Sequence, residues 1–102
     1  MRIGIMGGTF DPIHIGHLLL GEFAYEQFHL DEVWFLPNGN PPHKEVEDTE
    51  EALVHRVEMV RLAVRENPHF QLSLHEAKKD CHSYTYKTLQ EFHALYPENE
   101  YF

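Results

Sequence analysis

Residues 7–17, Gly-Gly-Thr-Phe-Asp-Pro-Ile-His-Ile-Gly-His, constrain the fold of this chain more than any other stretch. A short apolar run at 3–6 precedes them and predicts a buried strand, and an amphipathic run at 15–28 follows and predicts a helix. The stretch is therefore a strand-to-helix turn, where glycines let the backbone come close to a ligand. Because a helix start carries free amides and the positive end of the helix dipole, such a turn is an anion site.

Two histidines, His14 and His17, are three residues apart and are expected on one face of the first helical turn. We hypothesise a phosphate site in which their imidazoles add donors to the backbone amides. The helix start itself stays open: Asp11 and Pro12 suit the N-cap and first helical positions, but the helix can equally begin nearer His14.

Three other interpretations of this stretch remain. The glycine spacing matches neither the phosphate-loop pattern nor the dinucleotide fingerprint, so the glycines can simply mark a tight turn. The two histidines can be ordinary packed or surface residues. They can also be a metal pair, although its usual helical spacing is four with a third ligand nearby. Since no third ligand is evident, no metal held by the protein is expected.

A second apolar run, 33–36, predicts a strand buried on both faces, as in parallel sheets. Strand, helix and strand in this order form a right-handed crossover. The loop at 37–48 then lies at the carboxyl end of the second strand, where open α/β sheets bind ligands. A second helix opens at Asp48 with Glu51 as a capping box and ends at Asn67 and Pro68. Its expected core stripe is Leu53, Val57, Val60 and Val64.

The remaining elements complete the expected sheet. Residues 70–74 predict an edge strand, Ser83 caps a third helix that Pro97 stops, and residues 100–102 read as the opening of a fourth strand beside the first. The fold class is therefore α/β, a Rossmann-like parallel sheet with flanking helices: three strands, three helices and a truncated fourth strand. The third helix packs through Leu89, Phe92 and Tyr96. The first helix is expected to pack on the sheet through two rows, Ile15, Leu19 and Phe23, and Leu20, Ala24 and Phe28.

Composition limits the classes of function. The formal net charge of −9 over 102 residues argues against binding nucleic acid through a basic surface, so phosphate must be held by a few placed donors. The single cysteine, Cys81, excludes an intrachain disulfide and fits a reducing cytoplasm. No apolar run approaches membrane-spanning length, and no leader peptide is expected because the N-terminus runs straight into a strand.

Residues 7–18 closely resemble the signature of the nucleotidyltransferase superfamily with the His-x-Gly-His motif, and within it the bacterial nicotinate-nucleotide adenylyltransferases. Residues 37–44, Pro-Asn-Gly-Asn-Pro-Pro-His-Lys, and 83–85, Ser-Tyr-Thr, strengthen the resemblance. It covers about the first half of such an enzyme. It implies that residues 1–102 are the N-terminal part of a single nucleotidyltransferase domain. That domain would transfer AMP from ATP to nicotinate mononucleotide, giving deamido-NAD and pyrophosphate.

The resemblance also implies a role for individual residues. His14 and His17 would contact the ATP phosphates, with His17 at the α-phosphate, and the amides of Gly8, Thr9 and Phe10 would line the phosphate turn. Lys44 would reach the β- and γ-phosphates, and Mg²⁺ would arrive with ATP, held by phosphates and water. Asn40, Tyr84 and Thr85 would bind nicotinate mononucleotide, the backbone of the last two reading its carboxylate at a helix N-terminus.

The chain also departs from the family pattern. Asp80, Cys81 and His82 stand where family members carry glycines, and a Ser-Ser-Thr-x-x-Arg segment that binds ATP is not found. We therefore expect little turnover from these residues alone. We also expect an exposed edge on the first strand that pairs with another chain or a second copy. The alternatives are another adenylyl- or cytidylyltransferase of the superfamily, and a non-catalytic nucleotide-binding half-domain completed by a partner.

Overall fold

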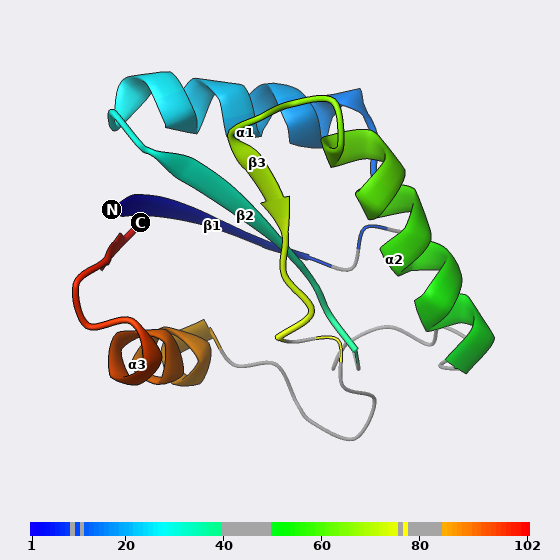
Figure 1. Ribbon diagram of the computed structural model, residues 1–102. Helices are drawn as coiled ribbons and strands as arrows, with labels where there is room; N and C mark the ends of the chain where they lie inside the picture. The colour runs from blue at the N-terminus through cyan, green and yellow to red at the C-terminus, as the bar shows by residue number, and fades with distance from the viewer. Residues whose placement is uncertain (9, 11, 40–49, 76, 78–84) are drawn as a thin grey trace.

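The computed structural model describes residues 1–8, 10, 12–39, 50–75, 77 and 85–102. Four strands and three helices alternate along the chain within these residues: β1 (Arg2–Gly8), α1 (Ile15–Gln27), β2 (Glu32–Pro37), α2 (Glu50–Val64), β3 (Phe70–Leu72), α3 (Thr85–Leu95) and β4 (Glu100–Tyr101). All pairings are parallel and the strand order is β3-β2-β1-β4 (Figure 1). The expected Rossmann-like α/β class, the β3 edge position and the place of the fourth strand beside the first are confirmed.

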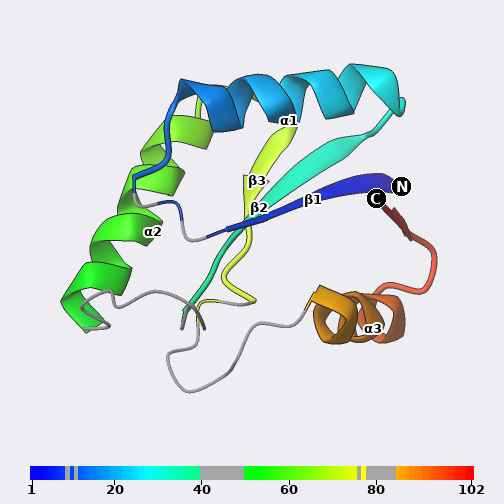
Figure 2. The same ribbon diagram turned by 180° about the vertical axis from the view of Figure 1, so that it is seen from behind.

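The two faces of the sheet are covered by different helices. Helices α1 and α2 lie on one face and α3 lies on the other (Figures 1 and 2). Neighbouring residues of β2 point to opposite faces, as the pleat requires. Phe35 is fully buried in the cluster that includes Val60 of α2, whereas Trp34 meets Phe92 of α3 edge-on at 5.3 Å between ring centroids. Side chains of β2 therefore contribute to the apolar contacts on both faces of the sheet.

Helix α2 packs as its sequence pattern predicted. Leu53, Val60 and Val64 are buried, and Val57 is half-buried on the same stripe. The expected capping residue Asp48 lies outside the described residues. On α3, Phe92 is buried and Leu89 half-buried as predicted. Tyr96, the third residue of the expected packing row, follows the end of the helix at Leu95; it contacts the Trp34 ring but is 49% exposed.

Helix α1 packs differently from the prediction. The row Ile15, Leu19 and Phe23 is exposed, at 73%, 53% and 70%, and Leu20 and Phe28 of the second row are exposed as well. The helix instead approaches the sheet at Gly21, where an added Cβ would lie 3.1 Å from the Cζ atoms of Phe35 and Phe70. This close approach turns the larger apolar side chains outward and leaves Leu18, Ala24 and Tyr25 as the partly buried contacts.

A polar cluster also fixes α1 to the connection before β3. The Glu22 carboxylate accepts a hydrogen bond from Asn67 Nδ2 at 2.5 Å and contacts His69 Nε2 at 2.8 Å. These bonds lower the pKa of Glu22. The His69 ring stacks on Tyr25 with centroids 3.7 Å apart, so the helix is held by polar as well as apolar contacts.

The expected exposed edge of the first strand is wrong for the first part of β1, as far as Ile5. β4 pairs with β1 at Arg2 and Ile3, the Phe102 amide donates to the Ile3 carbonyl at 2.9 Å, and the Ile5 amide donates to the Phe102 carbonyl at 2.9 Å. The last residues thus close this edge as far as Ile5, because even a two-residue strand supplies the backbone partners. Across the part of the chain that the structure describes, no helix is both long and apolar enough to span a membrane.

Candidate functional site

Helix α1 begins with two histidines that cap it reciprocally. His14 is the N-cap, and its Nδ1 accepts a hydrogen bond from the Gly16 amide at 3.1 Å. His17, the third helical residue, accepts a bond from the His14 amide on its own Nδ1 at 3.0 Å. This is the geometry of a capping box built from imidazoles. Of the two starts left open by the sequence, the helix uses the one at His14; Asp11 lies outside the described residues.

The capping bonds determine which nitrogen of each ring carries the proton. A ring nitrogen that accepts a hydrogen bond has no proton of its own, so the neutral rings of His14 and His17 both carry theirs on Nε2. The ring centroids are 4.0 Å apart. The pair therefore has a structural role as a helix cap, and it also offers two neighbouring Nε2–H donors at a helix start.

Electrostatics favour the neutral form of His17. The pKa of His17 is lowered from its ordinary value of 6.5, mainly by partial burial and to a smaller extent by the charge of nearby His14. The first turn of α1 contains no acidic residue, so no carboxylate there offsets the positive end of the helix dipole. An anion can therefore approach this end of the helix in a protein whose net charge is strongly negative.

The backbone of Gly16 lies against the capping ring of His14. A Cβ on Gly16 would lie 2.8 Å from Cε1 and 2.9 Å from Nδ1 of His14, closer than atoms can approach without a shift. The glycine of the motif thus leaves room for the capping imidazole to lean over the helix start.

In the turn before α1, Phe10 has a strained backbone conformation. This residue has φ of 50°, in the left-handed region that costs a non-glycine residue energy, while no described glycine has positive φ. Its ring is 3% exposed and packs between Phe35 and His17, meeting the His17 ring edge-on at 5.0 Å. The burial of this ring supports the strained backbone and the His17 ring together.

The structure brings together only some of the predicted site residues. Gly8 ends β1 opposite Pro37 of β2, next in space to Phe10, and the histidine pair follows at the same edge of the sheet. Thr9, Asn40, Lys44 and Tyr84 lie outside the described residues, as do Cys81 and Ser83. Thr85 is the first residue of α3. The histidine pair and the turn are therefore described, whereas the remaining expected contacts are not.

Sequence reasoning missed two residues at this edge. Nothing in the local sequence predicts the left-handed conformation of Phe10. In a turn with the sequence Gly-Gly-Thr-Phe, positive φ is expected at the glycines. Arg56 on α2 is only 4% exposed, and its Nη1 donates to the Asn38 carbonyl at 2.8 Å. An isolated arginine on an amphipathic helix normally lies at the surface, so nothing in the sequence marked it.

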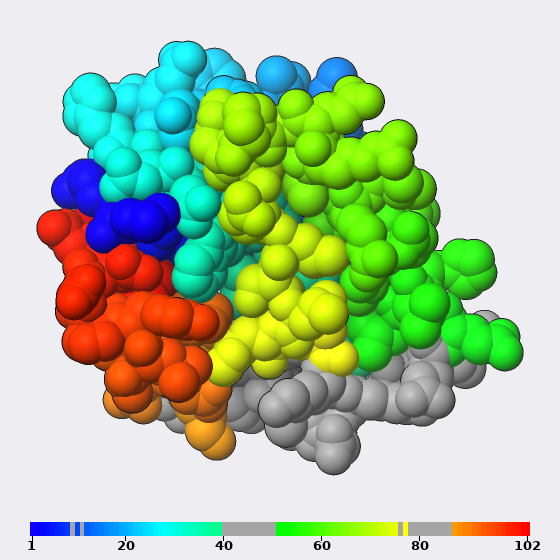
Figure 3. All heavy atoms as spheres, viewed as in Figure 1, coloured from blue at the N-terminus to red at the C-terminus, as the bar shows by residue number. Residues whose placement is uncertain are grey.

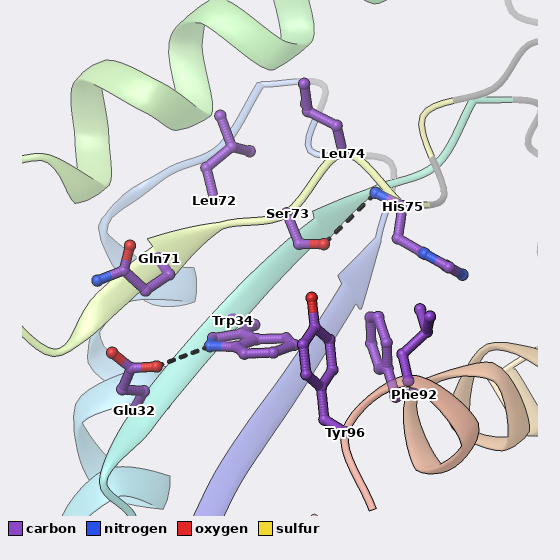
Figure 4. Close-up of a pocket in the computed structure, with 10 residues that line it drawn as sticks. Glu32, Trp34, Gln71, Leu72, Ser73, Leu74, His75, Phe92 and Tyr96 are labelled. Atoms are coloured by element: carbon purple, nitrogen blue, oxygen red, sulfur yellow. Dashed lines mark hydrogen bonds between the residues drawn. The ribbon is translucent and has the colours of Figure 1, made fainter. Parts of the chain in front are cut away.

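A separate groove of about 620 Å³ lies on the α3 face of the sheet (Figure 4). Trp34 forms its floor, Phe92 of α3 and Tyr96 just after that helix form one wall, and Glu32 and His75 lie at its ends. Among the described residues, its lining contains no lysine or arginine, and it includes the Glu32 carboxylate, which accepts a hydrogen bond from the Trp34 indole N–H at 3.0 Å. The described part of this lining thus presents no lysine or arginine to an anion, whereas the start of α1 presents the positive end of a helix dipole.

The space-filling view shows how the segments around the groove are arranged on the surface. Helix α2, in green, and the residues after β3, in yellow, lie next to each other, and α3, in orange, lies beyond them (Figure 3). Within the described residues, no group of three His, Cys, Asp or Glu side chains gathers that could hold a metal ion.

The profile of the cytidylyltransferase-like family matches residues 5–98. This chain belongs to that family. The match includes β1 from Ile5 onward, the histidine pair and all three helices. Cytidylyltransferase-like proteins are nucleotidyltransferases.

Curated members of the family are similar over the whole of this chain. A probable nicotinate-nucleotide adenylyltransferase of Exiguobacterium sibiricum is 52% identical over 102 residues, which are 100% of this chain and 53% of that protein. The nicotinate-nucleotide adenylyltransferase of Bacillus subtilis is 48% identical over 101 residues, 99% of this chain and 53% of its own length. The chain spans about half the length of the curated relatives it matches.

Solved structures share the fold. A nicotinic acid mononucleotide adenylyltransferase of Plasmodium falciparum complexed with NaAD superposes with a TM-score of 0.80 at 21% identity, over 98% of this chain and 49% of that one. The same enzyme complexed with APC gives a TM-score of 0.71 at 19% identity, over 98% and 48%. At this identity the likeness concerns the fold, and it extends through all four strands of the cytidylyltransferase-like sheet.

Proposed function

We propose that this chain is the nucleotide-binding half of an enzyme that transfers AMP from ATP to nicotinate mononucleotide, giving deamido-NAD and pyrophosphate. The observation that carries the proposal is the imidazole capping box, which presents two Nε2–H donors at a helix start. The names of relatives about 50% identical supply the substrates. Since those relatives are about twice as long, the complete reaction is proposed for a protein of their length.

The proposed reaction needs no nucleophile from the protein. An ionised phosphate oxygen of nicotinate mononucleotide attacks the α-phosphorus of ATP, the new P–O bond forms, and the bond to the β-phosphate oxygen breaks to release pyrophosphate. The protein holds the two reactants in line and stabilises charge on the phosphate oxygens. Donors that are fixed before the substrate arrives suit this task, because they need no reorganisation during the reaction.

His14 and His17 are the donors that we assign to the ATP phosphates, with Nε2–H of His17 on the α-phosphate. Their Nδ1 atoms are occupied by the Gly16 and His14 amides, so each ring is held in one tautomer and one orientation. The amides of Gly8, Thr9 and Phe10 are proposed to line the phosphate turn. Mg²⁺ is proposed to enter as part of the MgATP substrate, bound by phosphate oxygens and water.

The remaining assignments come from the resemblance to the adenylyltransferases. Lys44 is proposed to reach the β- and γ-phosphates. Asn40, Tyr84 and Thr85 are proposed to bind nicotinate mononucleotide, with the start of α3 facing its carboxylate. The lone cysteine and this reaction fit the cytoplasm, which we propose as the compartment.

Calorimetric titration with MgATP tests the proposal. The chain is expected to bind, and His17→Ala is expected to bind about tenfold more weakly, because one hydrogen bond to a charged phosphate is lost. Equal affinity of the two proteins would remove His17 from the site. With nicotinate mononucleotide added, these 102 residues are expected to release little pyrophosphate.

A substrate panel distinguishes the related reactions. A chain of the relatives' length should accept nicotinate mononucleotide with ATP and should reject CTP and phosphopantetheine. Turnover with CTP in place of ATP would favour a cytidylyltransferase.

A further inference from the structure

A buried arginine links helix α2 to the end of the sheet. Arg56 lies in the middle of α2 with 4% of its surface exposed, and its Nη1 donates to the Asn38 carbonyl at 2.8 Å. A guanidinium this far from water needs well-placed acceptors, because burial of an uncompensated charge is costly. The bond to Asn38 is therefore a fixed contact rather than an incidental surface one.

The same residue of the β2 end is bonded to β1. The Asn38 amide donates to the Gly8 carbonyl at 2.9 Å, one residue beyond the last paired position, Gly8 opposite Pro37. Asn38 thus receives a hydrogen bond from α2 on its carbonyl and gives one to β1 through its amide. The series Arg56, Asn38, Gly8 connects a helix on the face of the sheet to the residue that opens the phosphate turn.

We propose that Arg56 is a positioning residue that holds the ends of β1 and β2 together and so fixes the phosphate turn for ATP. The proposal rests on the proposed function for its ligand and on the two hydrogen bonds for its mechanism. Backbone donors on a turn act well only when the turn is rigid, because looseness there spreads the donors over several positions. Arg56 itself need not touch ATP.

The variants Arg56→Met and Arg56→Lys test the proposal. Methionine keeps the length and removes the donors, whereas lysine keeps the charge and one possible bond. Two matched controls lie on the same helix: Val60→Ala, at a fully buried position, lowers stability alone, and Arg61→Met removes a cation whose side chain is 57% exposed.

Amide hydrogen exchange and MgATP titration are the two measurements. Arg56→Met is expected to speed exchange of the Asn38 amide by more than its loss of global stability accounts for, and to weaken MgATP binding about fivefold to tenfold. Arg56→Lys should recover part of both. Val60→Ala and Arg61→Met should leave the Asn38 amide and the MgATP affinity of the folded protein unchanged.

Two results would overturn the positioning role. One is an Asn38 amide whose exchange in Arg56→Met follows global stability alone. The other is a Val60→Ala variant that loses as much MgATP affinity as Arg56→Met at equal stability. If the unaltered chain bound no MgATP, the proposed function would fail, and the Asn38 amide would still decide whether Arg56 fixes the strand ends.

Discussion

The ring of Phe10 meets the ring of His17 edge-on, with 5.0 Å between their centroids, while the Phe10 backbone is in the left-handed region. One buried side chain thus supports a strained turn and the orientation of an imidazole. The cost of the strained backbone, about 1–3 kcal/mol for such a residue, is offset by the burial of the ring.

Replacing Phe10 by leucine should affect both stability and binding. We expect the free energy of unfolding to fall by about 1 kcal/mol, because leucine fills less of the space between Phe35 and His17. MgATP affinity should also fall, because the His17 ring loses the edge-on contact that orients it. Urea unfolding and calorimetry measure the two effects. Phe70→Leu, in the same core cluster, is the control and should lower stability alone.

Asparagine at position 17 should separate capping from phosphate binding. Its Oδ1 can replace Nδ1 as acceptor for the His14 amide, but it has no donor at the position of Nε2. We expect the free energy of unfolding of His17→Asn to lie within about 0.5 kcal/mol of that of the unaltered chain. His17→Ala should lower it by about 1 kcal/mol, because the capping box is broken. Both should lose MgATP affinity. An asparagine variant that kept full affinity would contradict the assignment of Nε2.

Lowering the pH below 6.5 should reduce the stabilising contribution of His17 at the start of α1. The pKa of His17 lies below 6.5 in the folded chain, so below pH 6.5 the unfolded chain binds a proton that the folded His17 does not. The contribution of His17 to the free energy of unfolding therefore decreases as the pH falls from 6.5 through the lowered pKa, and it is constant above 6.5. Protonated Nδ1 also ceases to accept from the His14 amide.

An NMR titration of the His17 ring, with urea unfolding over the same pH range, measures this effect. His17→Asn should lack this part of the pH dependence. A His17 pKa at or above 6.5 would contradict the expected loss.

Substitution at Gly21 should lower the stability of the protein more than substitution at the more hydrophobic Phe23. Gly21→Val should lower the free energy of unfolding by about 2 kcal/mol, because its side chain meets the rings of Phe35 and Phe70. Phe23→Ala should change it by no more than about 0.5 kcal/mol, because Phe23 is 70% exposed. Thermal and urea unfolding of the two variants compare them directly. A large loss in Phe23→Ala would mean that the outer side of α1 is covered in solution.

The sequence predicted the elements that depend on local pattern. The apolar run of β2, the stripe of α2 and the strand-to-helix turn with its two histidines all lie where they were expected. These signals are local: apolar spacing, proline stops and glycine turns.

The features that were missed depend on contacts distant in sequence. Two apolar rows on α1 were together expected to pack on the sheet, but the helix approaches Phe35 and Phe70 at Gly21 and leaves most of both rows exposed. The burial of Arg56 depends on Asn38, which is 18 residues away. Lys44, Asn40 and Tyr84, outside the described residues, stay predictions.

The β1 edge is closed by residues from the far end of the sequence: the Glu100 amide donates to the Met1 carbonyl, and the Met1 ammonium donates to Asn99 Oδ1. During synthesis, β1 therefore has no partner on its outer side until residues about a hundred positions later have been made. Until then this side of the strand exposes unpaired backbone groups, with which other polypeptide chains can pair.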